Sequence, residues 1–171
     1  MSEVSPELEY VRRAAEDATR SASAEALAQS QVGKWSPLQV MEHLVLSYTA
    51  TTKGLLRTME SGEPERAGRD LGQQLRSFYV LGIGKFPAGI EAPKHTVPGA
   101  GLGTDPQRRF NDALVAMDAT LMNAERRFGP RAKVLAHPVL GPLTAQQWRR
   151  FHLVHGRHHV RQIAERLNGH P

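Results

Sequence analysis

Residues 148–162 read WRRFHLVHGRHHVRQ and hold four histidines, half of the eight in the chain. On an α-helix each residue turns by roughly 100°, so His152, His155 and His159 fall within an arc of roughly 60° and His158 falls outside it. Imidazoles at positions i and i+4 converge from one helix face, so His155 and His159 can hold one metal ion. The same pair also fits a buried core or interface position without metal.

Four segments carry the signals of long helices, in which apolar residues recur at helical spacing. Each start combines an N-cap residue with Pro or with Gln three residues later: Ser5-Pro6, Ser36-Pro37-Leu38-Gln39, Asp105-Pro106 and Thr144-Ala145-Gln146-Gln147. The corresponding ends are expected near Gly33, Gly62, Gly129 and Leu167. The histidine-rich stretch therefore belongs to the last of four long helices.

The region between the second and third of these helices is less regular. Pro64 could open a weaker helix through Leu71, Leu75 and Phe78. Residues 82–103, GIGKFPAGIEAPKHTVPGAGLG, are rich in Gly and Pro and predict a long loop that packs over one end of the bundle, with Phe86 as an anchor.

Polar and apolar residues do not alternate for long enough to suggest a strand, and residues 137–142, HPVLGP, predict a connecting turn. The expected fold is all-α. Residues 1–171 would form a single four-helix-bundle domain with one additional short helical segment and one long Gly/Pro-rich loop.

Composition narrows the class of protein and the chemistry of any site. A chain of 171 residues suits one domain, and its apolar content of 40% and mean hydropathy of −0.43 are typical of soluble proteins. Without an apolar run of about 18 residues or a secretory N-terminal segment, we expect a cytoplasmic, bacterial protein with no membrane association. Because cysteine is absent, nitrogen and oxygen atoms would have to bind any metal.

The net charge of +5 comes mainly from arginines that are scattered along the chain, often beside Glu or Asp. A nucleic-acid-binding surface usually concentrates its positive charge in one stripe, so we do not expect nucleic-acid binding. Five cations flank the long loop and could hold an anionic substrate or simply be solvated: Arg69, Lys85, Lys94, Arg108 and Arg109.

Three motifs together resemble the DinB-like (YfiT-like) superfamily of bacterial four-helix proteins. They are WSPLQVMEHLVLS at 35–47, HPVLGPLTAQQW at 137–148 and HLVHGRHHVRQI at 152–163. The resemblance covers most of the chain and is closest to a branch with a His-Pro-x-x-Gly turn before the last helix. It implies a divalent metal ion, zinc, nickel, iron or manganese, held by His43, His155 and His159.

The resemblance further implies a thiol-dependent transferase or a hydrolase that acts on a small molecule. It also implies a low-molecular-weight thiol as a possible partner and a homodimer. Three imidazoles leave coordination positions open to water or substrate, and no carboxylate is obviously placed as a fourth ligand. Glu42 and Gln162 are candidates to accept the outward N–H of a ligand imidazole. The alternative is a non-catalytic bundle that binds a small ligand or a protein partner, with structural histidines.

The remaining site candidates have more than one interpretation. His152 could support the ligands, replace one of them, or pack in the core. His158 is expected to face solvent, and His95 could reach the site from the loop or be an ordinary polar loop residue. We expect His137, before a proline, to shape the turn and Trp148 to belong to the core.

Overall fold

The computed structural model describes residues 4–86, 92–99 and 101–169. Four long helices form a bundle: α1 (Pro6–Thr19), α3 (Pro37–Ser61), α5 (Pro106–Phe128) and α6 (Ala145–Leu167). The other elements are α2 (Ala24–Ala28), α4 (Leu71–Ser77), the π-helical turn η1 (Phe78–Ile83), the 3-10 turn η2 (Lys94–Thr96), and the strands β1 (Leu135–His137) and β2 (Gly141–Leu143). The predicted all-α bundle is confirmed. None of the described helices is long and apolar enough to cross a bilayer.

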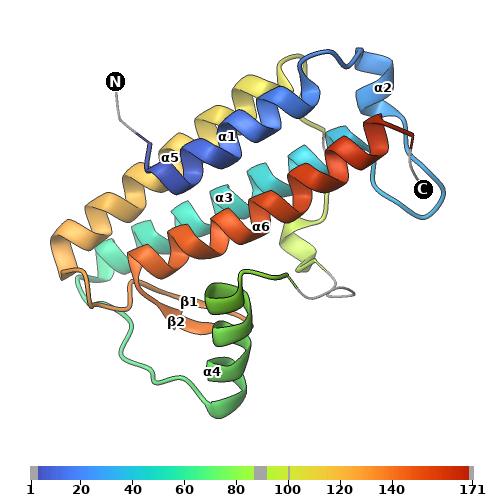
Figure 1. The fold of residues 1–171 in the computed structure, drawn as a ribbon. Coiled ribbons are helices and arrows are strands. Elements are labelled where there is room, and N and C mark those ends of the chain that lie inside the picture. Colours follow the sequence, from blue (N-terminus) through green and yellow to red (C-terminus); the bar gives the residue numbers. More distant parts are fainter. Residues whose placement is uncertain (1–3, 87–91, 100, 170–171) are drawn as a thin grey trace.

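The direction of the helices explains the long connection in the middle of the chain. Figure 1 shows α1 and α6 running one way and α3 and α5 running the other way. Because α3 and α5 are parallel, residues 62–105 must return along the bundle between them. Helix α3 packs against both α5 and α6, and α1 packs against α6. This crossover brings loop residues beside the faces of α3 and α6 that carry the histidines.

The predicted helix starts owe their positions to local hydrogen bonds. Ser36 and Gln39 form a capping box, and Thr144 and Gln147 form another, with side-chain-to-amide distances of 2.8 to 3.2 Å. Helix α3 ends as predicted at Gly62, whose φ of +77° favours glycine. These caps set the residues at which α3 and α6 begin.

The first helix is shorter than predicted. It was expected to reach Gly33, but α1 ends at Thr19 and a separate helix, α2, follows. The Ser23 hydroxyl accepts a hydrogen bond from the Ala26 amide at 3.2 Å and so caps a new helix. Short polar side chains near Ser23 compete with the helical backbone, and this local competition breaks the predicted continuous helix.

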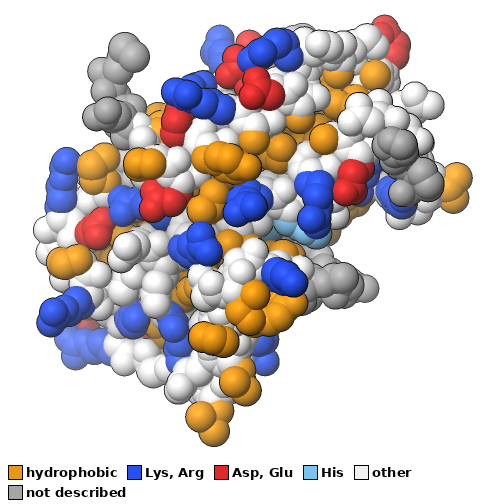
Figure 2. All heavy atoms as spheres, in the orientation of Figure 1, with side chains coloured by type: hydrophobic (Ala, Val, Ile, Leu, Met, Phe, Trp, Pro, Cys, Tyr) orange, Lys and Arg blue, Asp and Glu red, His pale blue; other side chains and the backbone are white. Residues whose placement is uncertain are grey.

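The weaker helix after α3 begins later than predicted, and Pro64 does not start it. Asp70 and Gln73 form the capping box that opens α4, with the Gln73 amide 2.7 Å from Asp70 Oδ1. The apolar stripe of this helix faces outward rather than into the bundle, and Figure 2 shows hydrophobic side chains gathered at that end of the molecule. Its exposed members are Leu71 and Leu75, and Phe78, the first residue of η1, is exposed as well.

A short β-hairpin replaces the simple turn that the sequence predicted before α6. Leu135 pairs with Leu143, and His137 pairs with Gly141 in an antiparallel register. Each strand has three residues, too few for a polar–apolar alternation to be recognised. The turn itself lies where it was predicted, and Gly141 has the positive φ of +74° that the turn needs.

On the face shown in Figure 2, Lys and Arg side chains are scattered among acidic and hydrophobic groups. Several arginines pair along their own helices, as Arg13 does with Glu9 at 2.6 Å and Arg20 does with Asp17 at 2.6 Å. These local pairs neutralise part of the positive charge where it lies.

Gly156 allows a close approach between α1 and α6. A Cβ atom at this position would lie 2.6 Å from Cγ1 and 3.0 Å from Cγ2 of Val11, which is fully buried. Alanine is the better helix former by about 1 kcal/mol. We nevertheless expect Gly156→Ala to lower the free energy of unfolding by about 1–3 kcal/mol, because the buried, branched Val11 side chain or the two helices must shift to make room for the added methyl group.

Urea unfolding measures this effect. The double variant Val11→Ala/Gly156→Ala should lose less stability than the sum of its single variants, because the clash disappears. Gly68→Ala is the control, since a Cβ at Gly68 meets no atom within 4 Å. A Gly156→Ala protein that is more stable than the wild type would contradict the close packing.

Candidate metal centre

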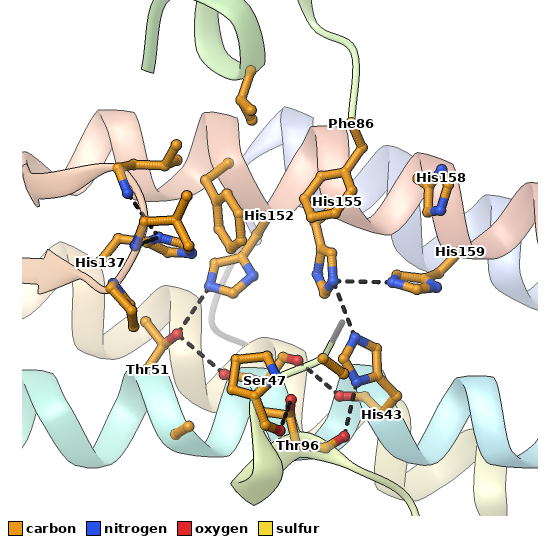
Figure 3. Close-up of a pocket in the computed structure, with 18 of the residues that line it drawn as sticks. His43, Ser47, Thr51, Phe86, Thr96, His137, His152, His155, His158 and His159 are labelled. Carbon is orange, nitrogen blue, oxygen red and sulfur yellow. Dashed lines mark hydrogen bonds between the residues drawn. The ribbon is translucent and has the colours of Figure 1, made fainter. Parts of the chain in front are cut away.

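Three buried histidines from two helices converge on one point. Figure 3 shows His43 of α3 pointing toward His155 and His159 of α6. His155 Nε2 lies 3.2 Å from His43 Nε2 and 3.0 Å from His159 Nε2. Nitrogens bound at about 2.0–2.1 Å to one tetrahedral zinc ion are about 3.3 Å apart, so these separations match those of ligands that share an ion.

Hydrogen bonds behind two of the rings fix their orientation. His43 Nδ1–H donates to the carbonyl oxygen of Thr96 at 2.8 Å, and His159 Nδ1–H donates to Gln162 Oε1 at 2.9 Å. A carbonyl oxygen can only accept, so both rings carry their proton on Nδ1. Each therefore directs an Nε2 lone pair toward the centre, as a metal ligand must.

The environment of the three rings keeps them neutral. Burial lowers the pKa of His43 from its ordinary value of 6.5 and lowers the pKa of His159 to about 3. Burial also holds the pKa of His155 well below 6.5, and the neighbouring imidazoles add to this effect. Since only the neutral imidazole binds a metal, protons compete weakly with a cation here.

Hydrogen bonding alone leaves this cluster unsatisfied. His43 and His159 both present lone pairs to His155, which can carry one proton on Nε2 at most. A divalent cation would accept all three lone pairs at once, so the donor set fits a metal ion better than it fits a core of structural histidines.

The candidate centre has three protein ligands. Within the described residues, no carboxylate joins the group formed by His43, His155 and His159. A structural zinc site is normally closed by a fourth protein ligand, whereas a catalytic site keeps a position open. The three histidines would therefore leave at least one coordination position of an ion open.

A cavity of about 620 Å³ adjoins the three histidines. The described parts of the crossover contribute Phe86, His95 and Thr96 to its wall. The Phe86 ring lies 5.3 Å from the ring of His155, between ring centroids, so the predicted anchor role of Phe86 is confirmed. The loop packs beside the histidines along α3 and α6 and forms part of the site. Residues 87–91 and 100 of the predicted loop lie outside the described part.

His152 lies on the same face of α6 but outside the three-histidine group. The Thr51 hydroxyl donates a hydrogen bond to the carbonyl of Ser47 at 3.1 Å. Its oxygen therefore accepts a hydrogen bond from His152 Nε2–H, also at 3.1 Å. The His152 ring is fully buried and stacks on Trp148. Of the roles left open by the sequence, packing against α3 and Trp148 agrees best with these contacts.

His137 has the structural role that was predicted for it. Its Nδ1 accepts hydrogen bonds from the amides of Val139 and Leu140 at 3.1 and 3.2 Å, which closes the hairpin turn. Burial lowers the pKa of His137 to about 4, consistent with a neutral ring. Trp148 is buried as predicted and donates its indole N–H to the carbonyl of Leu135 at 3.0 Å.

The prediction that His158 faces solvent is wrong. The ring is half-buried, lies 5.4 Å from the Phe86 ring and contributes to the cavity wall. Its Nε2 accepts a hydrogen bond from the amide nitrogen of Gln162 at 3.1 Å, so it helps to orient the residue that holds His159. The crossover residue Phe86, distant in sequence, is what covers His158.

Glu42 and Gln162 were the two residues expected to accept the outward N–H of a candidate ligand imidazole. Gln162 does so for His159, whereas Glu42 has a different role. Glu42 accepts hydrogen bonds from the amides of Gly99 and Gly101 and so anchors the loop. The role of Thr96 could not be predicted from the sequence, because a backbone carbonyl has no signature in the residue type.

The five cations that flank the loop in sequence are absent from the described wall of the cavity. Arg69, for example, donates to Pro142 O and Gln147 Oε1 at the hairpin instead. Two cations that sequence reasoning did not single out, Lys34 and Arg166, line the cavity in their place.

Comparison with known proteins agrees with the fold and the histidine pattern. The chain matches the family model described as DinB superfamily over residues 7–163, which is nearly its whole length. Neither the curated proteins nor the solved structures contain a significant match to the chain. The helical bundle, the three converging histidines and the extent of the family match establish that the chain belongs to the DinB superfamily.

Proposed function

We propose that the protein is a divalent-metal-dependent enzyme that acts on a small molecule, by thiol-dependent transfer or by hydrolysis. One observation carries the proposal: three buried Nε2 atoms, from His43, His155 and His159, lie close enough together to bind one ion. When bound, a divalent ion supplies Lewis acidity, which polarises a substrate oxygen or lowers the pKa of a water or thiol.

The chain's own residues prepare the site for this chemistry. The Thr96 carbonyl and Gln162 hold two of the imidazoles in their ligand orientation before any ion arrives. Phe86 and Trp35 pack their rings against ligand histidines at centroid distances of 5.3 and 5.2 Å. Such apolar neighbours limit the access of water and strengthen electrostatic interactions at the site.

The alternative of a non-catalytic bundle with structural histidines agrees less well with these contacts. A structural histidine places each hydrogen-bonded ring nitrogen opposite a complementary group, as His137 does when its Nδ1 accepts from two backbone amides. His155 Nε2 instead faces the lone pairs of both His43 and His159, and one ring nitrogen can give a proton to at most one of them.

Cobalt substitution tests whether the centre is open to a thiol. We expect cobalt-loaded protein to show visible ligand-field bands and, on addition of 2-mercaptoethanol, a new near-ultraviolet thiolate-to-cobalt charge-transfer band. The reason is that three histidines leave at least one coordination position for an exogenous ligand. A cobalt spectrum that is unchanged by excess thiol and by other small anions would mean that the centre is closed, and would contradict a catalytic role.

A further inference from the structure

The described wall of the cavity beside the histidines carries positive charge that no acidic side chain of the wall balances. Among the described residues that line it, there is no Asp or Glu, whereas two cations, Lys34 and Arg166, are present. The histidines in the wall do not offset this charge, because an imidazole is either neutral or positive. A ligand in this cavity therefore meets positive charge and no described carboxylate.

Among the described residues, the Arg166 side chain makes no hydrogen bond and no ion pair within 4 Å, unlike most partly buried guanidinium groups. Its Nη1 atom is buried and makes no hydrogen bond in the described part of the chain. The carboxylate of Glu165 attracts Arg166 electrostatically, but its ion pair, at 3.6 Å, is with Arg161. By contrast, the partly buried Arg149 pairs with Asp118 and Glu125 at 2.9 and 2.8 Å. Leaving a buried donor unpaired costs free energy, and a bound anion would remove that cost.

The position of Arg166 places it in the same site as the metal ligands. On α6 it follows His159 by seven residues, so it lies on the same side of the helix about 10 Å further along. Gln162, which holds the His159 ring, lies between them and also lines the cavity. Lys34 reaches the same cavity from the segment before α3, next to Trp35.

We propose that the cavity binds a small molecule with a carboxylate at one end, held by Arg166 with support from Lys34. The rest of the molecule would extend past the aromatic wall toward the three histidines. A guanidinium group binds a carboxylate through two parallel hydrogen bonds, which suits a donor that has no hydrogen-bond partner among the described residues. The inference rests on the proposed function in one respect: it names the substrate class of that same site.

Isothermal titration with a matched pair of probes tests the proposal. The probes are 3-phenylpropanoate and its neutral analogue 3-phenylpropanamide, which differ mainly in charge. The measurement uses chelator-treated protein, so that the carboxylate cannot gain affinity by binding a metal ion. We expect wild-type protein to prefer the acid by about tenfold or more, and Arg166→Gln to lose that preference.

Arg157→Gln is the matched control, since Arg157 is an exposed arginine of the same helix that lies outside the wall of this cavity. It removes the same charge and should keep the preference for the acid. Arg166→Lys should keep part of the preference, and thermal melts check that each variant folds. The proposal is overturned if wild-type protein does not prefer the acid, or if Arg166→Gln prefers it as strongly as the wild type.

Metal titration of the same preparations separates this inference from the proposed function. Suppose that the protein prefers the acid to the amide, that this preference depends on Arg166, and that the protein cannot be loaded with metal. This result would support the anion site and contradict the proposed metalloenzyme. Normal metal loading without any preference for the acid would overturn the anion site and leave the metal centre in place.

Discussion

Replacing His155 with alanine is expected to weaken zinc binding by more than about 100-fold, because it removes the ligand that lies between the other two. Changing a group that merely orients a ligand typically costs 10–100-fold in metal affinity, so about 100-fold is a lower bound for removing the ligand itself. Titration with zinc in competition with a chromophoric chelator gives the dissociation constant.

His152→Ala is the matched comparison, because His152 is buried on the same face of α6 but lies outside the three-histidine group. It should keep one zinc per chain. It should also lose about 2–4 kcal/mol of stability, since the change leaves a cavity and removes the partner of Thr51. Metal-free His155→Ala should lose less stability than metal-free His152→Ala, because among the described residues His155 hydrogen-bonds only to the other two histidines, whereas His152 is the partner of Thr51.

His155→Ala should therefore lose zinc binding and keep more of its stability, whereas His152→Ala should keep zinc binding and lose more stability. If His155→Ala bound zinc as tightly as the wild type and lost about 1–3 kcal/mol of stability, His155 would be a structural residue. Loss of zinc in His152→Ala, with retention in His155→Ala, would place the metal at a different set of histidines.

Replacing Arg149 with methionine is expected to lower the free energy of unfolding by about 3–5 kcal/mol, because the change leaves the buried carboxylate of Asp118 without its cation. The Asp118 side chain is 4% exposed, and Arg149 Nε lies 2.9 Å from its Oδ1. Asp118 Oδ2 also accepts the amide proton of Ser5, the residue before α1, at 2.6 Å. This one carboxylate therefore links α1, α5 and α6.

Arg20→Met provides the control for this loss of a salt bridge. Arg20 lies 2.6 Å from Asp17, which is a shorter distance than that in the buried pair, but both side chains are about two-thirds exposed. Water and salt screen such a pair, so its loss should cost less than about 1 kcal/mol. Chemical denaturation compares the two variants, and similar small losses in both would show that burial of Asp118 does not matter for stability.

Sequence reasoning worked best where the cause of a structure is local. The capping boxes at Ser36 and Thr144, and glycine at the end of α3, depend only on residues a few positions apart. The helical period likewise places His155 and His159 on one face, whatever surrounds them. The family resemblance was needed to bring in His43, because nothing local relates a residue of α3 to one of α6.

The errors arose where tertiary contacts or very short elements decide the outcome. Nothing in the residues around His158 shows that Phe86, from the crossover, covers it. The hairpin strands are too short to produce a periodic signal. Arg166 resembles any basic residue near the end of a helix, and only the missing partner of its buried Nη1 distinguishes it.

The most direct test of the central claim is the metal content of the wild-type protein, purified without an affinity tag and measured by elemental mass spectrometry. Thermal melts with and without a chelator accompany it. The account predicts about one divalent metal ion per chain and a lower melting temperature after chelation, because a ligand that binds only the folded state stabilises it. The three-histidine metal centre would be contradicted by protein that holds no metal and cannot be loaded with zinc, nickel, iron or manganese. Such protein would also melt at the same temperature with chelator and with each added metal.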